Sequence, residues 1–385
     1  MANHVDVVLQ RNRRIRRRKI IRFLVFALIV GICVFIYSKR EVWFPKLEGI
    51  GTRYQNVTQN EEAIADGEFE LSISGGVDYT ADFINNQLFI LCDKYLYIYG
   101  TDGKLIDSRQ HAYSNAIMKT SESRSLIYSS NGMTFRVDTP AKILYEETLD
   151  KPIWFAVLSD EGYVAVVTES ETYACRLSIY DMNGKLIYTR DCVDRLSDVS
   201  FYGNGCIFSA IGAKDGELVT TLQYITFDGD DVLWETSPFS SLCMRTCAFS
   251  DGSAFVIGDT RTAYYSGTGA LLGSYDFNAD LVDFDYFNEK TAILLKNEGR
   301  RQSILLLFSE KSAVPKTVSL SANAKNVIIY DDMAYVLDSG QIESFDFTGQ
   351  KTGSTQVADA YERILRNGKY FYLLGYDKIN RTSVG

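Results

Sequence analysis

Alternating apolar and polar positions recur along this chain in pairs of short segments joined by tight turns. In the clearest pair, Leu177 to Cys192, two alternating segments flank Asn183-Gly184. Asn-Gly favours the positive φ angles of a type I′ turn, so the sequence predicts a two-residue β-hairpin here. Hairpins of the same design are predicted over Leu96 to Ile106, Leu222 to Trp234, Thr262 to Leu272 and Ile342 to Thr352.

The spacing of the turn glycines predicts a repeat. They are 81, 45, 40 and 80 residues apart, which is one period of about 40 with two turns that lack their glycine, near Thr139-Pro140 and Ser309-Glu310. The five glycines are Gly103, Gly184, Gly229, Gly269 and Gly349. A period near 40 built from short strands is typical of a β-propeller, in which each repeat forms one four-stranded blade. The sequence therefore predicts an all-β fold.

The two ends of the repeat region are incomplete in complementary ways. Glu68 to Ser74 alternates strictly but has no hairpin partner nearby, while three strands without a fourth are predicted over Tyr361 to Leu365, Tyr370 to Leu374 and Ile379 to Val384. We expect the N-terminal strand to complete the last blade, because pairing the ends closes the ring and removes exposed strand edges. Residues 67–385 then give eight blades; seven is the alternative, if the C-terminal strands pack elsewhere.

An aromatic residue recurs four positions before the turn glycine. These residues are Tyr99, Tyr180, Tyr265 and Phe345. Both faces of a blade meet neighbouring blades, so we expect the aromatic rings to pack between blades and not to stack on a ligand.

The N-terminal 37 residues differ from the repeats. A basic segment, Arg11 to Lys19, precedes an apolar run from Ile20 to Tyr37 that is broken only by Arg22. As a helix this run would reach about 27 Å, just enough to span a bilayer if the side chain of Arg22 extends to the interface. A cleaved signal peptide is the alternative, but no small-x-small cleavage motif follows the run, which favours an uncleaved anchor. The basic excess before the span predicts a cytoplasmic N-terminus and an extracytoplasmic body.

These patterns predict four regions: a basic cytoplasmic segment (1–19), a transmembrane helix (20–37), a stalk (38–66) and the propeller (67–385). A basic run can also serve nucleic-acid binding or nuclear targeting, but one that abuts a membrane span is better explained by topology. The whole chain has a formal net charge of −9. Beyond residue 48 there are 29 basic and 46 acidic side chains, a net charge of −17 that argues against nucleic acid as a partner.

Six of the seven cysteines lie in the propeller region. Counting back from the Asn183-Gly184 turn places Cys175 opposite Cys192, within the range of a disulfide. The alternative is a pair of reduced thiols that fill a gap between blades. No pairing is predicted for the others, which are Cys92, Cys206, Cys243 and Cys247. A zinc site at Cys243 and Cys247 is not predicted, because the chain offers no second Cys or His pair.

The basic N-terminus, the single span and repeats of the form L-x-I-Y-x-x-x-G-K-L-I resemble a family of bacterial membrane-anchored β-propellers of unknown function. More distantly, they are similar to quinoprotein-like and WD-type propellers. The resemblance covers nearly the whole chain. It implies the fold and the topology, and it implies no catalytic residue.

The sequence contains no recognisable motif of enzyme chemistry. The chain has no G-x-S-x-G, and His111 lies in a polar stretch that is predicted to be a surface loop. Neither Asp228 to Asp231 nor Asp283 to Asp285 has the ligand spacing of a calcium loop. No catalytic, cofactor-binding or metal-binding residue is therefore predicted, and no cofactor.

The sequence favours a non-enzymatic binding or scaffolding module at the cell envelope, with a protein or another envelope component as partner. Two alternatives remain: a carboxylate-dependent hydrolase that acts on polysaccharide or peptide through the central channel, and a sensor or assembly factor with a cytoplasmic partner. Carboxylates with raised pKa values that converge at the channel would favour the hydrolase. An exposed apolar or aromatic patch would favour the binding module.

Overall fold

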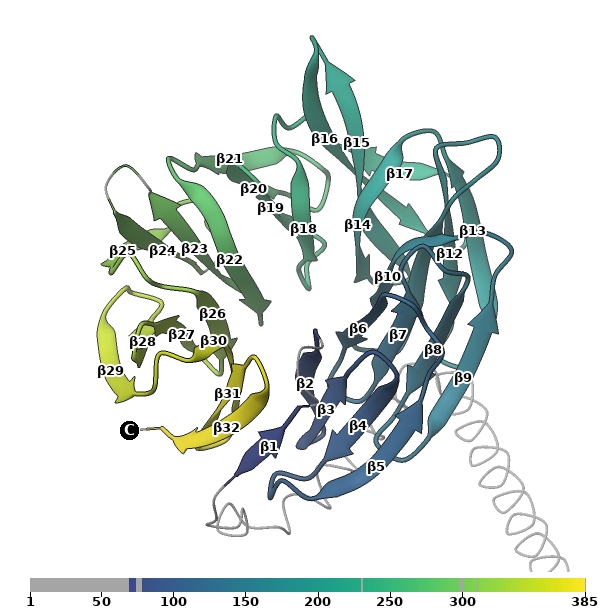
Figure 1. Cartoon of the computed structure of the whole chain (residues 1–385). Coiled ribbons are helices and arrows are strands. Elements are labelled where there is room, and N and C mark those ends of the chain that lie inside the picture. Colours follow the sequence, from purple (N-terminus) through teal and green to yellow (C-terminus); the bar gives the residue numbers. More distant parts are fainter. Residues whose placement is uncertain are drawn as a thin grey trace, which may run out of the picture. The chain divides into compact units, whose positions relative to one another are not determined.

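The chain forms a propeller of eight blades. In the computed structural model, which describes residues 69–73, 78–229, 231–297, 299, 301–309 and 311–384, thirty-two strands form eight antiparallel four-stranded sheets. The sheets are arranged in a ring around a central channel (Figure 1). The described residues contain no α-helix. The predicted all-β fold and the count of eight blades are confirmed, and the alternative of seven is wrong.

Blades 1 to 4 are each built from one continuous stretch of chain, inner strand first. Blade 1 contains β2 (Thr80–Ile84), β3 (Gln87–Leu91), β4 (Tyr95–Tyr99) and β5 (Leu105–Gln110). Blade 2 contains β6 (Ala116–Thr120), β7 (Ser125–Ser129), β8 (Thr134–Asp138) and β9 (Ile143–Thr148). Blade 3 contains β10 (Ile153–Leu158), β11 (Val164–Thr168), β12 (Cys175–Tyr180) and β13 (Leu186–Cys192). Blade 4 contains β14 (Arg195–Tyr202), β15 (Gly205–Lys214), β16 (Glu217–Thr226) and β17 (Val232–Glu235).

Blades 5 to 7 follow the same order, and blade 8 does not. Blade 5 contains β18 (Cys243–Ala248), β19 (Ala254–Gly258), β20 (Arg261–Tyr265) and β21 (Leu271–Asp276). Blade 6 contains β22 (Asp280–Phe287), β23 (Lys290–Asn297), β24 (Gln302–Phe308) and β25 (Lys316–Leu320). Blade 7 contains β26 (Asn326–Tyr330), β27 (Met333–Asp338), β28 (Gln341–Asp346) and β29 (Lys351–Gln356). Blade 8 contains β30 (Tyr361–Asn367), β31 (Tyr370–Gly375), β32 (Lys378–Ser383) and β1 (Glu70–Ser72).

The ring is closed by its two ends. Strand β1 is the outermost strand of blade 8 and pairs antiparallel with β32, with Leu71 opposite Ile379. The ring of Phe69 meets that of Tyr372 edge-on at 5.1 Å between centroids. Pairing the first strand with the last blade leaves no exposed sheet edge at the seam. The predicted closure is confirmed.

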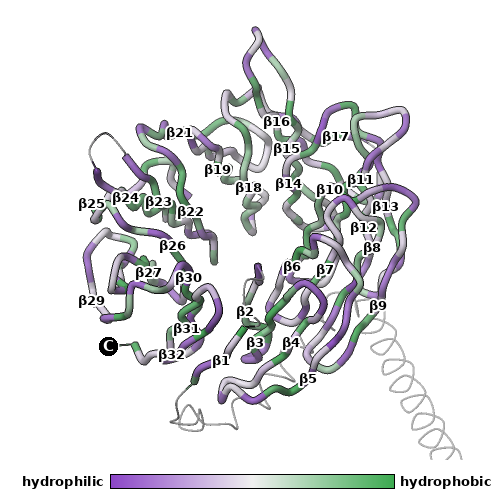
Figure 2. Tube along the Cα trace, in the orientation of Figure 1, coloured by the Kyte–Doolittle hydropathy of each residue, from purple (hydrophilic) through white to green (hydrophobic). Residues whose placement is uncertain are grey.

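Hydrophobic packing between blades forms the core. Eight clusters of buried apolar side chains occur, one at each junction between neighbouring blades. Figure 2 shows hydrophobic stretches along the strands and hydrophilic ones at many connections. The recurring aromatic residues Tyr180, Tyr265 and Phe345 are buried in three of these clusters, and Tyr99 packs against a fourth. Their predicted role between blades is confirmed.

The predicted type I′ turn at Asn183-Gly184 is wrong. Only Gly184 of the two has a positive φ, 83°. Its N–H donates to the carbonyl of Asp181 at 3.0 Å, and the N–H of Asp181 donates to the carbonyl of Lys185 at 2.8 Å. Residue 187 then forms a bulge, as is usual when a type I turn ends in a left-handed glycine. The bulge restores the register expected from the shorter turn, so Cys175 still lies opposite Cys192.

The predicted membrane span and stalk lie outside the described residues. Within the part of the chain that is described, no helix has the length and apolar character needed to cross a bilayer. The boundaries 1–19, 20–37 and 38–66 therefore stay predictions.

Candidate functional site

The wall of the central channel is the first candidate site. A recess of about 340 Å³ lies in this wall, between the inner strands of blades 6, 7, 8 and 1. Polar residues that line it include Asp82, Asp283, Asp285, Asn326 and Arg363. The recess therefore combines acidic, amide and guanidinium groups from four blades.

The carboxylates of blade 6 bind the edge of blade 7. Asp283 Oδ2 accepts hydrogen bonds from Asn326 Nδ2 at 2.7 Å and from the N–H of Val327 at 2.9 Å. Asp285 Oδ2 accepts from the N–H of Ile329 at 2.6 Å, while its Oδ1 accepts from the N–H of Tyr286 at 2.8 Å. The inner strand is an edge strand, so its outward N–H groups need partners that the sheet itself does not supply. These aspartates supply them.

The same device joins other neighbouring blades. Asp198 of β14 accepts from the N–H of Thr246 in β18 at 2.7 Å, and Ser200 Oγ accepts from the N–H of Ala248 at 3.0 Å. Asn326 Oδ1 accepts from the N–H of Ile364 in β30 at 2.9 Å. Many of the polar side chains along the channel are therefore used in hydrogen bonds that connect neighbouring blades.

These aspartates have raised pKa values. Burial raises the pKa of Asp283 and raises that of Asp285 to about 6, and hydrogen bonds from backbone N–H groups oppose the effect. The nearby charges of Asp283 and Asp82 raise the pKa of Asp285 further. Burial also raises the pKa of Asp82 and Asp198. Carboxylates with raised pKa values in the channel are the feature expected of a hydrolase, but here their oxygens are engaged by backbone and side-chain donors.

Cys175 and Cys192 lie directly opposite each other, as predicted, and both are buried among the side chains between blades 3 and 4. Both are free thiols in this structure, as are the other described cysteines. The hydrogen bond between the two lowers the pKa of Cys175 and, together with burial, raises the pKa of Cys192. The register fits a disulfide and the packing fits two reduced thiols, so the crosslink stays a prediction.

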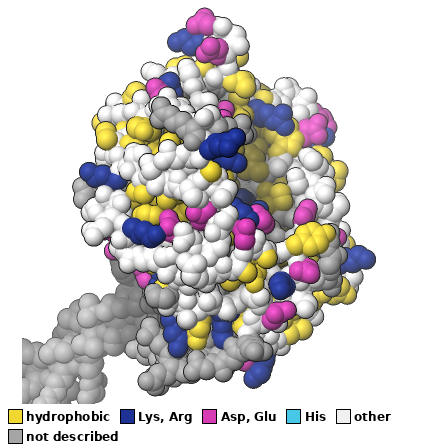
Figure 3. All heavy atoms as spheres, turned by 60° about the vertical axis from the view of Figure 1, so that its left-hand side comes forward, with side chains coloured by type: hydrophobic (Ala, Val, Ile, Leu, Met, Phe, Trp, Pro, Cys, Tyr) yellow, Lys and Arg dark blue, Asp and Glu magenta, His cyan; other side chains and the backbone are white. Residues whose placement is uncertain are grey.

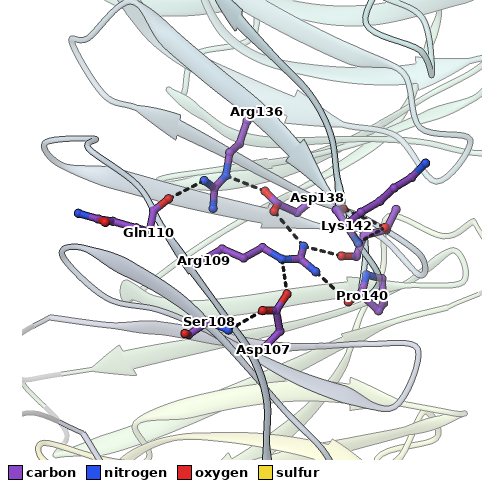
Figure 4. A network of polar contacts seen from close by, with 9 residues as sticks. Asp107, Ser108, Arg109, Gln110, Arg136, Asp138, Pro140 and Lys142 are labelled. Carbon is purple, nitrogen blue, oxygen red and sulfur yellow. Dashed lines mark hydrogen bonds and ion pairs between the residues drawn. The ribbon is translucent and has the colours of Figure 1, made fainter.

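A buried ionic network joins blades 1 and 2, which the sequence did not indicate (Figure 4). Arg109 of β5 donates to Asp138 Oδ1 at 3.0 Å and to the carbonyls of Thr139 and Pro140 at 2.7 and 2.9 Å. Arg136 donates through Nε to Asp138 Oδ2 at 2.8 Å. Asp138 is fully buried and is shared by both guanidinium groups. Burial raises its pKa against the two positive charges.

The expectation that His111 lies in a surface loop is wrong. It is buried beside this network, and its Nε2 is 2.8 Å from the carbonyl oxygen of Cys92. Burial lowers the pKa of His111. The described residues contain no cluster of three or more His, Cys, Asp or Glu side chains that could hold a metal ion. The hydrogen-bond partner of His111 is a backbone carbonyl, so this contact links the side chain to the fold.

The second candidate site is a hairpin that projects from blade 4. Its strands, β15 and β16, have ten residues each, whereas β14 and β17 beside them have eight and four. Ile211 is the last residue of β15 that pairs with β14, where its partner is Arg195, so residues 212–218 extend beyond the sheet as a two-stranded ribbon. The tip is exposed and includes Leu218, which is 61% exposed. Figure 3 shows charged side chains at the end of this projection, at the top of the view.

Solved structures similar to this chain are propellers with little sequence identity. The computationally designed Ika8 protein has a TM-score of 0.63 and 12% identity, covering 83% of this chain and 100% of its own. Sqt1 of Saccharomyces cerevisiae has a TM-score of 0.59 and 10% identity, covering 83% and 98%. BamB from Moraxella catarrhalis has a TM-score of 0.55 and 10% identity, covering 82% and 98%. At such identities the likeness supports the fold alone.

No curated protein sequence matches the chain. A family model does match, over residues 56–382, which includes every strand of the propeller except the last residue of β32. This protein therefore belongs to DUF5711, a family of unknown function.

Proposed function

We propose that this protein is a non-enzymatic binding or scaffolding module at the cell envelope, held by a single N-terminal span with its propeller on the extracytoplasmic side. The observation that carries the binding role is the β15–β16 hairpin. It leaves the sheet of blade 4 and exposes Leu218 at a position where the side chain stabilises no core. A rigid ring that presents a projecting segment suits recognition of a protein partner.

The anchor and the side of the membrane rest on the sequence of residues 1–37, with its basic run before an apolar one. The cysteine pair gives independent support that can be tested. If Cys175 and Cys192 form a disulfide in cells, the propeller lies in an oxidising compartment. Protein isolated under alkylating conditions should then resist thiol labelling at both positions until it is reduced.

A carboxylate-dependent hydrolase is the second candidate, because the channel recess holds Asp283 and Asp285 with raised pKa values. Against it stands the use of both carboxylates as acceptors for blade 7. The two candidates differ in the part of the ring they need. A hydrolase needs the channel, and a binding module needs the hairpin.

The test is partner capture that depends on the hairpin. Full-length protein should be crosslinked in cells, solubilised in detergent and purified, and the same should be done with a variant in which residues 213–218 are replaced by Asn-Gly. Gly212 and Val219 lie opposite each other, so this turn can close the shortened ribbon. We expect a crosslinked partner that is lost from the shortened variant and kept in Asp285→Asn. Loss of the partner from Asp285→Asn alone would move the site to the channel.

A further inference from the structure

Exposed aliphatic side chains mark the start of the outer strand in five consecutive blades. They range from 38% exposed at Ile187 to 58% at Leu272. We call this set the apolar rim; it consists of Leu105, Ile106, Ile143, Leu186, Ile187, Leu233, Leu271 and Leu272. Each member directly follows the turn between the third and fourth strands of its blade.

These positions are structurally equivalent around the ring. In blades 1 to 5 the fourth strand begins with one residue that pairs with the third strand and one that forms a bulge, as Leu186 and Ile187 do in blade 3. The corresponding residues of blade 7 are Lys351 and Thr352, and β25 of blade 6 begins with Lys316 and Thr317. The rim is therefore an arc over blades 1 to 5 and not a general property of the repeat.

No single large patch results, because each blade contributes only one or two of these side chains. Equivalent positions of blades in a ring lie close to one plane. A partner that covers the rim residues of all five blades at once must therefore be flat and extended.

The N-terminal end of the described chain, at Phe69, lies at the same level of the ring. A Cβ added to Gly184, in the last turn of blade 3, would lie 2.7 Å from Tyr145 of the preceding blade's outer strand, and Gly269 stands in the same relation to Trp234. Gly103 of blade 1 has this relation to Phe69, at 2.9 Å. Phe69 directly precedes β1, the outer strand of blade 8. Its position corresponds to that of Tyr145 in blade 2, which lies two residues after the rim residue Ile143. Phe69, the first described residue, therefore lies at the level of the ring where the other outer strands display their rim residues.

Lysines flank the rim. Lys104, Lys142 and Lys185 directly precede the aliphatic pairs of blades 1 to 3, and all three are exposed. Aliphatic side chains next to lysines suit the boundary between lipid tails and phosphate headgroups, where the lysine stem lies along apolar surface and its charge reaches the phosphates.

We propose that the apolar rim rests on the surface of the lipid bilayer that holds the anchor. This inference depends on the anchor of the proposed function. The 31 residues between Tyr37 and Phe69 could extend up to about 100 Å, so the tether alone does not bring the ring to the membrane. Contact through the rim would do so, and it would fix the orientation of the ring.

The experiment separates the tether from the rim. Full-length protein with a specific protease site inserted in the stalk is reconstituted into vesicles of equal parts phosphatidylcholine and phosphatidylglycerol. Before cleavage the protein should float with the vesicles and resist alkaline extraction. If the uncleaved protein does not float or is extracted by alkali, the proposed membrane anchor is wrong. After cleavage, the part of the released propeller that still floats measures the rim.

We expect a substantial share of the cleaved wild-type propeller to float. Serine at six rim positions should reduce that share roughly tenfold, because aliphatic burial at the interface is lost. The six positions are Leu105, Ile106, Leu186, Ile187, Leu271 and Leu272. The matched control places serine at exposed apolar positions outside the rim, namely Met133, Tyr173, Val193, Met244 and Tyr376, and should float like the wild type.

Circular dichroism and the unfolding temperature establish that the variants are folded. If the sixfold variant does not fold, Leu271→Ser with Leu272→Ser changes one blade only and should still lower the floating share. Complete release of the cleaved wild-type propeller would overturn the proposal, as would equal release of the rim and control variants. So would a cleaved propeller that forms a dimer through the rim, because the occupant would then be a second copy of the chain.

Discussion

The channel wall and the apolar rim differ in what their side chains contact. Along the channel, Asp283 and Asp285 turn onto the backbone of the next blade and complete its hydrogen bonds. Along the rim, side chains such as those of Leu271 and Leu272 are largely exposed and bury little surface within the ring. The channel side chains therefore stabilise the propeller, whereas the rim side chains are available for contact with a surface outside the protein, such as the proposed bilayer. This difference predicts opposite consequences of substitution in the two regions.

Among the polar contacts between blades, we expect the buried network of blades 1 and 2 to contribute most to the free energy of unfolding. Asp138→Asn removes the charge that two buried guanidinium groups share, and we expect it to lower the free energy of unfolding by about 3 kcal/mol. Chemical denaturation of the detergent-solubilised protein measures this. Asp107→Asn is the control, because Asp107 also bonds Arg109 but is partly exposed, and it should cost less than about 1 kcal/mol. Equal effects would mean that burial of Asp138 is not what matters.

The channel should give a pH-dependent stability. The pKa of Asp285 is raised in the folded protein from its ordinary value of 3.8 to about 6, so the folded state binds this proton more tightly than the unfolded state does. Its contribution to stability is full below about pH 4 and is lost as the pH rises through 6. Asp285→Asn should remove a decline on the order of 1 to 2 kcal/mol from the profile between these values.

Unfolding curves of wild type and Asp285→Asn across pH 4 to 7 test this prediction. Asp231→Asn, an exposed change of the same kind, should leave the wild-type slope intact. A slope that survives in Asp285→Asn would assign the decline to the other channel aspartates.

The smallest effect on stability is expected at the rim. Leu186→Ser should change the free energy of unfolding by no more than about 0.5 kcal/mol, since the side chain is largely exposed. Leu177→Ser in the partner strand is the control: that leucine is fully buried, and its loss should cost more than about 2 kcal/mol. A large cost at Leu186 would make the rim part of the core and contradict the comparison.

The blade count and the closure could be predicted because both depend on local pattern. Turn glycines near a 40-residue spacing mark the blades, and an unpaired strand at each end marks the seam. The register of Cys175 and Cys192 was predicted from a turn of the wrong type, since the bulge at residue 187 offsets the longer turn. Alternation constrains register more strongly than it constrains turn geometry.

The joints between blades could not be predicted, because their partners are one repeat apart. Asp283 and the N–H of Val327 are separated by 44 residues, and Arg109 and Asp138 by 29. The sequence did contain a signal. Polar residues at alternate positions of an inner strand, Asp283 with Asp285 and Asp198 with Ser200, face the edge of the next blade. His111 is buried beside the network of Arg109, Arg136 and Asp138, and no pattern in the residues around it predicted that burial.

The side of the membrane on which the propeller lies is the central claim of the proposed function. Protease added to spheroplasts that express the full chain with a tag at each end tests it most directly. The account predicts that the C-terminal tag and the propeller are lost while the N-terminal tag stays protected until the cells are lysed. A C-terminal tag that survives in intact spheroplasts and is digested only after lysis would contradict the account.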